Sequence, residues 1–190
     1  MKYTDRVGKA IEKAAILHKD QVTKGDGKTP FIVHPIKVMA IVGEYTNDED
    51  TIIASILHDT VEDTDYTLND LEKDFGRKVR EIVAGVTEEK LDQDGQKRPW
   101  LIRKKDYLRN LEKDCPESLL VSAADKITNT ESLIFEYKRV GKKLEENFNA
   151  TFEETHWYHD EVINILDKRL KSEIVDRLKT VQWEAKRIVI

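Results

Sequence analysis

Two histidines and two aspartates are the residues whose types and positions could do chemistry. They are His34 at the expected start of a helix, the pair His58-Asp59 at the end of an apolar run, and Asp125 at the end of a second apolar run. Imidazole nitrogens and carboxylate oxygens together suit a divalent ion such as Mn, Fe, Zn or Mg. Neighbouring helical residues diverge by about 100°, yet at a helix end both can face one ion. The pattern favours a metal site without choosing the metal.

Asp125 carries the strongest physical argument of the four. A carboxylate inside a packed helix costs several kcal/mol unless it is paired or bound to a metal. Lys126 is a competing partner, since a salt bridge would also satisfy that carboxylate. For His34 the alternative is an ordinary hydrogen-bonded histidine beside a helix start, and a His-Asp dipeptide can arise by chance. The residues alone leave these alternatives open.

An acidic pair follows the His-Asp dipeptide at helical spacing. Glu62 and Asp63 come three to five residues after His58 and Asp59, so a helix places them on or near the same face. Beside a metal, such a pair could deprotonate an attacking water and protonate a leaving oxygen. The alternative is a solvated helix end.

The elements that must position these groups are predicted to be helices. Proline suits the first helical turn, so His34-Pro35 marks the mouth of a helix. Asp48 and Thr67 are expected N-caps, the latter in a capping box with Asp70. Apolar residues at helical spacing predict helices over 5–19, 36–42, 48–58, 67–75, 79–86, 100–111, 116–125, 148–170 and 173–188.

No segment shows a strand-like alternation, and no Pro/Gly/Ser-rich stretch divides the chain. We therefore predict an all-α protein, a compact bundle of about eight to ten helices with little or no strand. Residues 1–190 are expected to form one domain, with a core over about 5–140 and C-terminal helices over 141–190. The polar stretch 88–97 is predicted to be a loop.

Composition limits the partners. Charged residues make up 36% of the chain and the formal net charge is −5, which argues against a general nucleic-acid binder. A small anionic partner would need a local basic cluster. The candidates follow the 88–97 loop, and a solvated helix face is the alternative for each of them: Arg98, Arg103, Lys104, Lys105 and Arg109.

The location expected from the sequence is the cytoplasm. One cysteine, Cys115, allows no internal disulfide and fits a reducing compartment. The first residues lack the apolar core of a signal peptide, and no segment reaches the ~18–20 apolar residues of a membrane span, so no membrane partner is expected. Formation of a homo-oligomer is compatible with these features.

The order of the motifs resembles the HD-domain superfamily, and within it the hydrolase domain of RelA/SpoT-type alarmone enzymes and their small stand-alone and metazoan relatives. The matching segments appear in family order across about residues 14–135. They are Thr29 to Ile36 around His-Pro, Leu57 to Thr64 around HDTVED, Phe75-Gly76, Gly85-Val86-Thr87, and Ala124-Asp125-Lys126 with Asn129. The combination is far more specific than any one dipeptide.

This resemblance implies a fold, a site and an activity. It implies one divalent ion, Mn²⁺ in the family, held by His34, His58, Asp59 and Asp125, with Glu62 and Asp63 as the catalytic acidic pair. The implied reaction is hydrolysis of guanosine 3′,5′-bis(diphosphate) at its 3′-diphosphate, which releases pyrophosphate and GDP or GTP. The substrate-binding residues that it implies are Lys24, His18, Asn129 and Thr128.

Two other functions stay open, the first of them because of departures from the family pattern. Thr23-Lys24 stands where relatives carry Arg-Lys, and Thr128 precedes Asn129 where they tend to carry an aromatic residue or His. The first alternative is a phosphatase of the same type acting on another nucleotide such as NADPH. The second is a non-catalytic nucleotide sensor. A chain of 190 residues leaves no room for a synthetase domain, so degradation of the alarmone is expected rather than synthesis.

Overall fold

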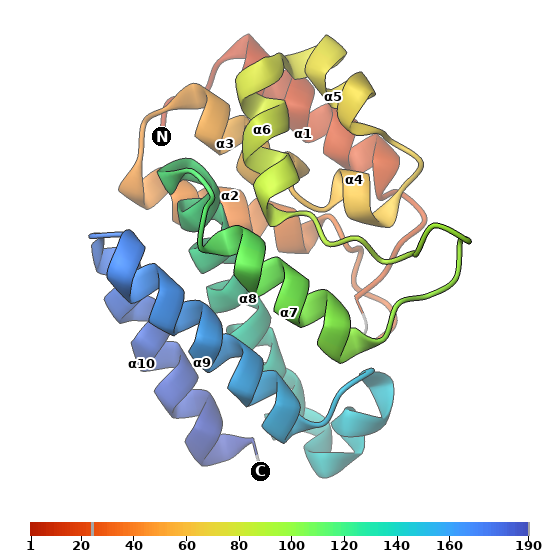
Figure 1. The fold of residues 1–190 in the computed structure, drawn as a ribbon, viewed down its shortest axis with the longest axis vertical. Helices are drawn as coiled ribbons and strands as arrows, with labels where there is room; N and C mark the ends of the chain where they lie inside the picture. Colours follow the sequence, from red (N-terminus) through yellow and green to blue (C-terminus); the bar gives the residue numbers. More distant parts are fainter. Residues whose placement is uncertain (24, 190) are drawn as a thin grey trace.

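The computed structural model describes residues 1–23 and 25–189, which form ten α-helices and one 3-10 helix (Figure 1). Across these residues, extended pairing is limited to the isolated bridges Val22–Pro30 and Leu91–Lys97. The prediction of an all-α fold with eight to ten helices is confirmed. The elements are α1 Asp5–Leu17, α2 Val33–Tyr45, α3 Glu49–Leu57, α4 Thr60–Asp63, α5 Leu68–Phe75, α6 Arg77–Val86, α7 Trp100–Leu111, α8 Pro116–Val140, η1 Gly141–Asn147, α9 Phe152–Arg169 and α10 Glu173–Ile188.

Side-chain caps set several helix starts. The Asp48 carboxylate accepts a hydrogen bond from the Thr51 amide at 3.0 Å and so caps α3. Thr67 and Asp70 form the expected capping box at the start of α5. A second box, made by Thr151 and Glu154, begins α9 at Phe152. The expected start at residue 148 was therefore too early.

Gly76 joins α5 to α6 with a backbone that favours glycine. Its φ of 93° and ψ of 166° lie in a region that other residues rarely adopt, while a Cβ there would meet no atom within 4 Å. We expect Gly76→Ala to lower the free energy of unfolding by roughly 1–3 kcal/mol through backbone strain alone. Urea unfolding followed by circular dichroism measures this, with exposed Lys73→Ala as the control. Equal stabilities of the two variants would contradict the assignment.

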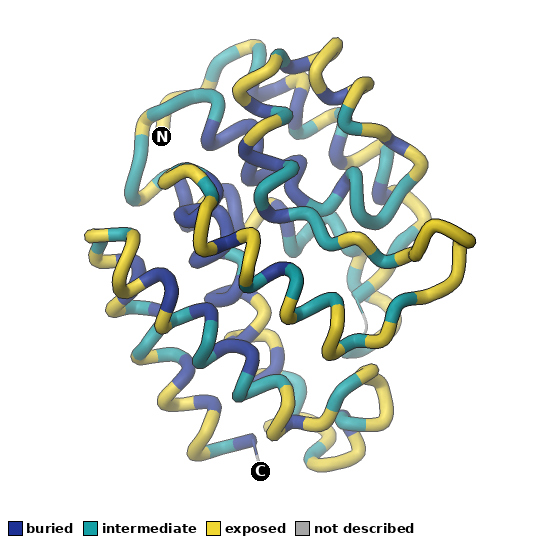
Figure 2. Tube along the Cα trace, viewed as in Figure 1, coloured by how far each residue is buried: buried dark blue, intermediate teal, exposed yellow. Residues whose placement is uncertain are grey.

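The long helix α8 is the centre of the packing. It contacts α2, α3, α6, α9, α10 and η1 (Figure 1). Figure 2 shows buried residues along the inward sides of the helices and exposed residues on the outer sides and on the loop after α6. The apolar run that was expected to end at Asp125 continues, because Ile127 and Thr128 are also buried and the helix runs on to Val140.

Two apolar clusters share this helix. The larger one joins the buried residues of α1 to α8 with those of α9 and α10. The smaller one surrounds the C-terminal part of α8 and contains Leu133, Ile134, Leu144, Phe152, Ala185 and Val189. α8 thus links the two clusters, with Asp125 in the part that belongs to the larger cluster.

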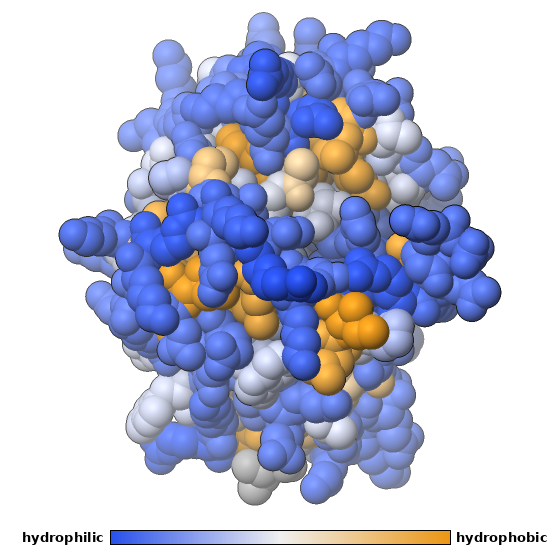
Figure 3. Space-filling view, viewed as in Figure 1, coloured by the Kyte–Doolittle hydropathy of each residue, from blue (hydrophilic) through white to orange (hydrophobic). Residues whose placement is uncertain are grey.

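The face seen in Figure 3 is mostly hydrophilic, with apolar side chains gathered in separate patches. This agrees with the high proportion of charged residues. In the part of the chain that the structure describes, none of the helices has the length and apolar character needed to cross a bilayer.

Candidate metal centre

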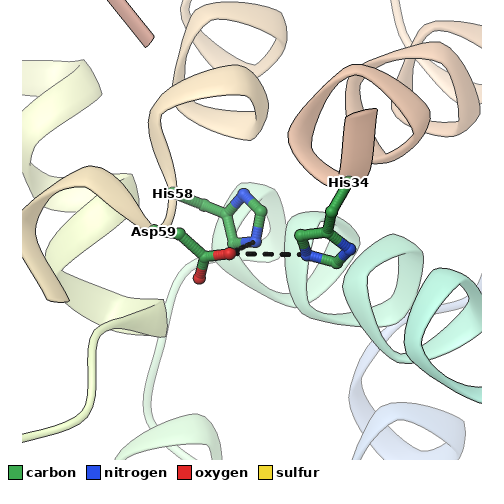
Figure 4. Close-up of side chains that lie close together, drawn as sticks. All are labelled: His34, His58 and Asp59. Carbon is green, nitrogen blue, oxygen red and sulfur yellow. Dashed lines mark ion pairs between the residues drawn. The ribbon is translucent and has the colours of Figure 1, made fainter. Parts of the chain in front are cut away.

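The four metal-ligand candidates come from α2, from the junction between α3 and α4, and from α8, and their side chains meet at one point. Figure 4 shows His34 projecting from the start of α2 toward His58 and Asp59, which follow α3. His34 Nε2 lies 3.4 Å from Asp59 Oδ2 and 3.1 Å from Asp125 Oδ1. His58 Nε2 lies 3.1 Å and 3.7 Å from the same two oxygens. The structure therefore brings together all four side chains that the sequence singled out.

The local backbone explains why neighbours in sequence can face the same point. His58 is the C-cap of α3 and Asp59 the N-cap of the short α4, and both keep right-handed helical dihedrals across the junction. The helix axis changes between them, so their side chains converge instead of diverging. His34 lies in the first turn of α2, directly before Pro35, as the sequence predicted.

His58 is held in the tautomer that suits a ligand. Its Nδ1 lies 2.8 Å from the Ser55 carbonyl oxygen, which can only accept, so Nδ1 carries the proton in the neutral ring. Nε2 is then a lone-pair nitrogen, and among the described residues it has no hydrogen-bond partner of good geometry although the residue is only 3% exposed. A buried nitrogen of this kind beside two carboxylate oxygens fits a divalent cation.

Asp125 is held from two sides. The Lys126 ammonium lies 2.5 Å from Oδ2, and the Asn129 side-chain amide donates to Oδ1 at 2.7 Å. Oδ1 is also the oxygen that faces both histidines. The salt bridge that competed with the metal interpretation exists, but it uses the other oxygen, so the two interpretations are compatible.

Charge dominates the protonation of this cluster. Burial alone would lower the pKa of His34, but hydrogen bonds to Asp125 and Asp59 outweigh it and leave that pKa raised. Burial would raise the pKa of Asp125, yet the charge of Lys126 and the hydrogen bond from His34 hold it well below the usual range. A cation that binds here therefore competes with protons on the imidazoles.

Lys126 is itself buried, and its ammonium lies 5.2 Å and 5.5 Å from the ring centroids of Tyr107 and Tyr158. The two tyrosine rings thus hold the Lys126 ammonium in the position from which it pairs with Asp125. We expect Lys126→Met, which keeps the length of the stem, to weaken binding of a divalent ion by about 10- to 100-fold, the usual effect of losing a partner of a metal ligand. Titration calorimetry with Mn²⁺ measures this. Unchanged affinity in a folded variant would contradict the role.

The acidic pair lies on α4, directly after Asp59. Glu62 is mostly buried, and burial followed by the charge of Asp59 raises its pKa. Glu62 Oε2 accepts a hydrogen bond from the Glu88 amide at 3.1 Å, and the Lys90 ammonium lies 3.1 Å from Glu62 Oε1 while pairing also with Asp63. A raised pKa makes the ionised carboxylate a stronger base toward a nearby water.

The expected substrate-binding residues have different surroundings. His18 is 1% exposed, its Nδ1 lies 2.8 Å from Gln21 Oε1, and its ring packs on Phe31, which packs in turn on His34. Its ring thus packs beside the site from the interior, and contact of His18 with the substrate stays a prediction. Lys24 lies outside the described residues.

The other two expected substrate-binding residues lie on α8, beyond Asp125. Thr128 is also buried and donates to backbone oxygens of Ala124 and Asp125. Asn129 is exposed and holds Asp125. Of the expected substrate-binding residues that the structure describes, only Asn129 has a side chain open to solvent.

Ion pairs between the loop after α6 and helix α7 were not predicted from the sequence. The Glu88 side chain is only 6% exposed and lies 3.1 Å from the Arg103 guanidinium, and it also pairs with Lys104. A solvated helix face is therefore wrong for these two cations, although Arg109 fits it with 72% of its side chain exposed. The basic residues of α7 were visible in the sequence, but their partner Glu88 lies at the other end of the loop between α6 and α7.

The chain is similar to known proteins of one family. The sequence profile of the HD domain family matches residues 10–153. The chain is 38% identical to the guanosine-3′,5′-bis(diphosphate) 3′-pyrophosphohydrolase MESH1 of Mus musculus over 126 aligned residues. The alignment covers 65% of this chain and 67% of that protein. A probable GTP pyrophosphokinase of Mycobacterium leprae is 38% identical over 137 residues, 68% of this chain but 16% of that protein.

Solved structures extend the likeness to the whole fold. A protein described as a metazoan ortholog of SpoT that hydrolyzes ppGpp and plays a role in starvation responses has a TM-score of 0.75 and 26% identity, over 98% of this chain and 97% of that one. A crystal structure of a Listeria monocytogenes protein has a TM-score of 0.70 and 27% identity, over 80% of this chain and 99% of that one.

Proposed function

Because this chain belongs to the HD domain family, we propose that it is a metal-dependent phosphohydrolase that cleaves guanosine 3′,5′-bis(diphosphate), or the pentaphosphate, to pyrophosphate and GDP or GTP. The observation that carries the proposal is the convergence of two imidazoles and two carboxylates beside the half-buried acidic pair of α4. Similarity to proteins named for this reaction supports the choice of substrate.

His34, His58, Asp59 and Asp125 would hold the ion. When bound, a divalent ion supplies a water of lowered pKa and neutralises charge on the phosphoryl oxygens. Glu62 accepts a proton from the attacking water, a role that its raised pKa supports. Asp63 lies beside it and can relay that same proton to the leaving oxygen. No serine or cysteine nucleophile is required.

Finer features are part of the same proposal. Mn²⁺ is the proposed ion because the family resemblance implies it, whereas a mixed shell of imidazole and carboxylate is compatible with several divalent metals. The net charge of −5 argues against nucleic acid as the partner, and similarity to proteins named for ppGpp hydrolysis supports a small nucleotide. A free Cys115 supports a reducing, cytoplasmic location. One domain over 1–190 is supported by the contacts of α8 with helices from both halves of the chain. Formation of a homo-oligomer is also part of the proposal, and light scattering, which measures the molar mass in solution, tests it.

The test is a nucleotide panel with the protein loaded with Mn²⁺, Mg²⁺, Zn²⁺ or Fe²⁺, in which pyrophosphate and orthophosphate are measured separately. We expect pyrophosphate from ppGpp and pppGpp. Release of orthophosphate from NADPH, with no pyrophosphate from ppGpp, would show that the substrate is another nucleotide and not the alarmone. Binding of nucleotides without turnover under any metal would make the protein a sensor.

A further inference from the structure

The segment between α6 and α7 begins by passing over the acidic pair of α4, and then extends away from the bundle before it returns as α7 (Figure 1). Two groups of this segment hold the two oxygens of Glu62. The Glu88 amide donates to Oε2 at 3.1 Å, and the Lys90 ammonium lies 3.1 Å from Oε1. Lys90 also contacts Asp63 Oδ1. The carboxylate of Glu62 is thus oriented from outside its own helix.

Glu88 ties this segment to α7. Its buried carboxylate is shared between Arg103 and Lys104. We call the ion pairs of Glu88 with Arg103 and Lys104 the anchor. The Lys104 ammonium lies 4.5 Å from the ring centroid of Tyr158, so the anchor packs against a residue of α9. A buried ion pair of this kind is costly to break, because removal of one partner leaves a charge without compensation. The anchor gives the Glu88 amide a fixed position relative to Glu62.

Lys90 differs from this anchor. Its side chain is 38% exposed, and exposed ion pairs contribute little to stability, about 0–1 kcal/mol. It nevertheless bridges the two residues that the proposed reaction uses. An ammonium between two adjacent carboxylates offsets their mutual repulsion and restricts the rotamers of both. This location favours a role in the reaction over a role in folding.

We propose that Lys90 is a positioning residue of the hydrolysis: it holds Glu62 and Asp63 in the orientation that proton transfer needs, opposite the amide of the anchored Glu88. The proposal rests on the proposed function of the acidic pair. The competing interpretation is a surface ion pair without consequence for turnover.

The test compares Lys90→Met and Lys90→Arg with Lys113→Met, which removes an exposed lysine with no ion-pair partner among the described residues. For Lys90→Met we expect at least a tenfold fall in kcat on ppGpp, a change in KM below threefold, and unchanged metal content and Tm. Lys90→Arg should recover kcat to within threefold of wild type. A kcat of Lys90→Met within twofold of wild type, or an equal fall in Lys113→Met, would overturn the proposal.

A second measurement does not depend on the substrate. Hydrogen exchange of the peptide covering 87–99 should accelerate in Lys90→Met and in Glu62→Ala, because the Glu88 amide then loses its oriented acceptor, and should be unchanged in Lys113→Met. If the wild-type protein does not cleave ppGpp, the proposed function is wrong. The exchange measurement still shows whether Lys90 holds Glu62 against the Glu88 amide. Unchanged exchange in both variants would show that Lys90 and Glu62 do not hold one another.

Discussion

Asp59→Ala is expected to emerge from desalting without its divalent ion and without measurable turnover. Asp59 Oδ2 is the oxygen that lies within 3.4 Å of both histidine nitrogens, so its loss removes the centre of the cluster. Loss of a residue that only supports a ligand costs about 10- to 100-fold in affinity, and loss of a ligand should exceed that.

The control for this variant is Asp65→Ala, which removes an exposed carboxylate six residues further along the chain. Metal content is measured by inductively coupled plasma mass spectrometry after equilibration with Mn²⁺, and folding by circular dichroism. We expect Asp65→Ala to match wild type. Equal metal content in Asp59→Ala and wild type would remove Asp59 from the ligand set.

Glu62→Gln is expected to separate metal binding from chemistry. The substitution keeps the size of the side chain and an oxygen that can accept the Glu88 amide, but it removes the group that accepts a proton. Metal content should equal that of wild type, while kcat falls by about 10²- to 10⁴-fold, the usual contribution of general acid–base catalysis. Steady-state assays with ppGpp and metal analysis on the same preparation measure both.

Glu72→Gln provides the matched change on an exposed part of α5. It should leave kcat and metal content as they are in wild type. Two results would contradict the role of Glu62: metal loss equal to that of Asp59→Ala, or a kcat within tenfold of wild type. The first would make Glu62 a ligand, and the second would leave proton transfer to another group.

The sequence was most informative where local rules act alone. Asp48 and Thr67 cap their helices as expected, since a cap depends on residues only three positions apart. The meeting of His34, His58 and Asp125 needed more, because periodicity cannot bring three helices together. The order of the motifs supplied it through the resemblance to a family.

Other features lay beyond local patterns. α8 continues past Asp125 because the Lys126 ammonium packs on two tyrosine rings and the Thr128 hydroxyl donates to a backbone oxygen one turn earlier, so polar residues there cost little. The ion pairs of Glu88 join residues 15 and 16 positions apart across a loop. Such pairs follow from the tertiary fold, and no spacing rule predicts them.

The position of Asp125 within α8 has a thermodynamic consequence. Leu133 and Ile134, two turns further on, pack in the C-terminal cluster, about 12 Å along the same helix axis. One rigid element thus belongs both to a ligand set and to the docking surface of α9 and α10. An ion that binds only when α8 is ordered stabilises the packing of α9 and α10 on α8 by its binding free energy. Detachment of α9 and α10 must then lower the affinity for the ion by the same free energy. Ion binding and the packing of α9 and α10 are therefore two parts of one linked equilibrium.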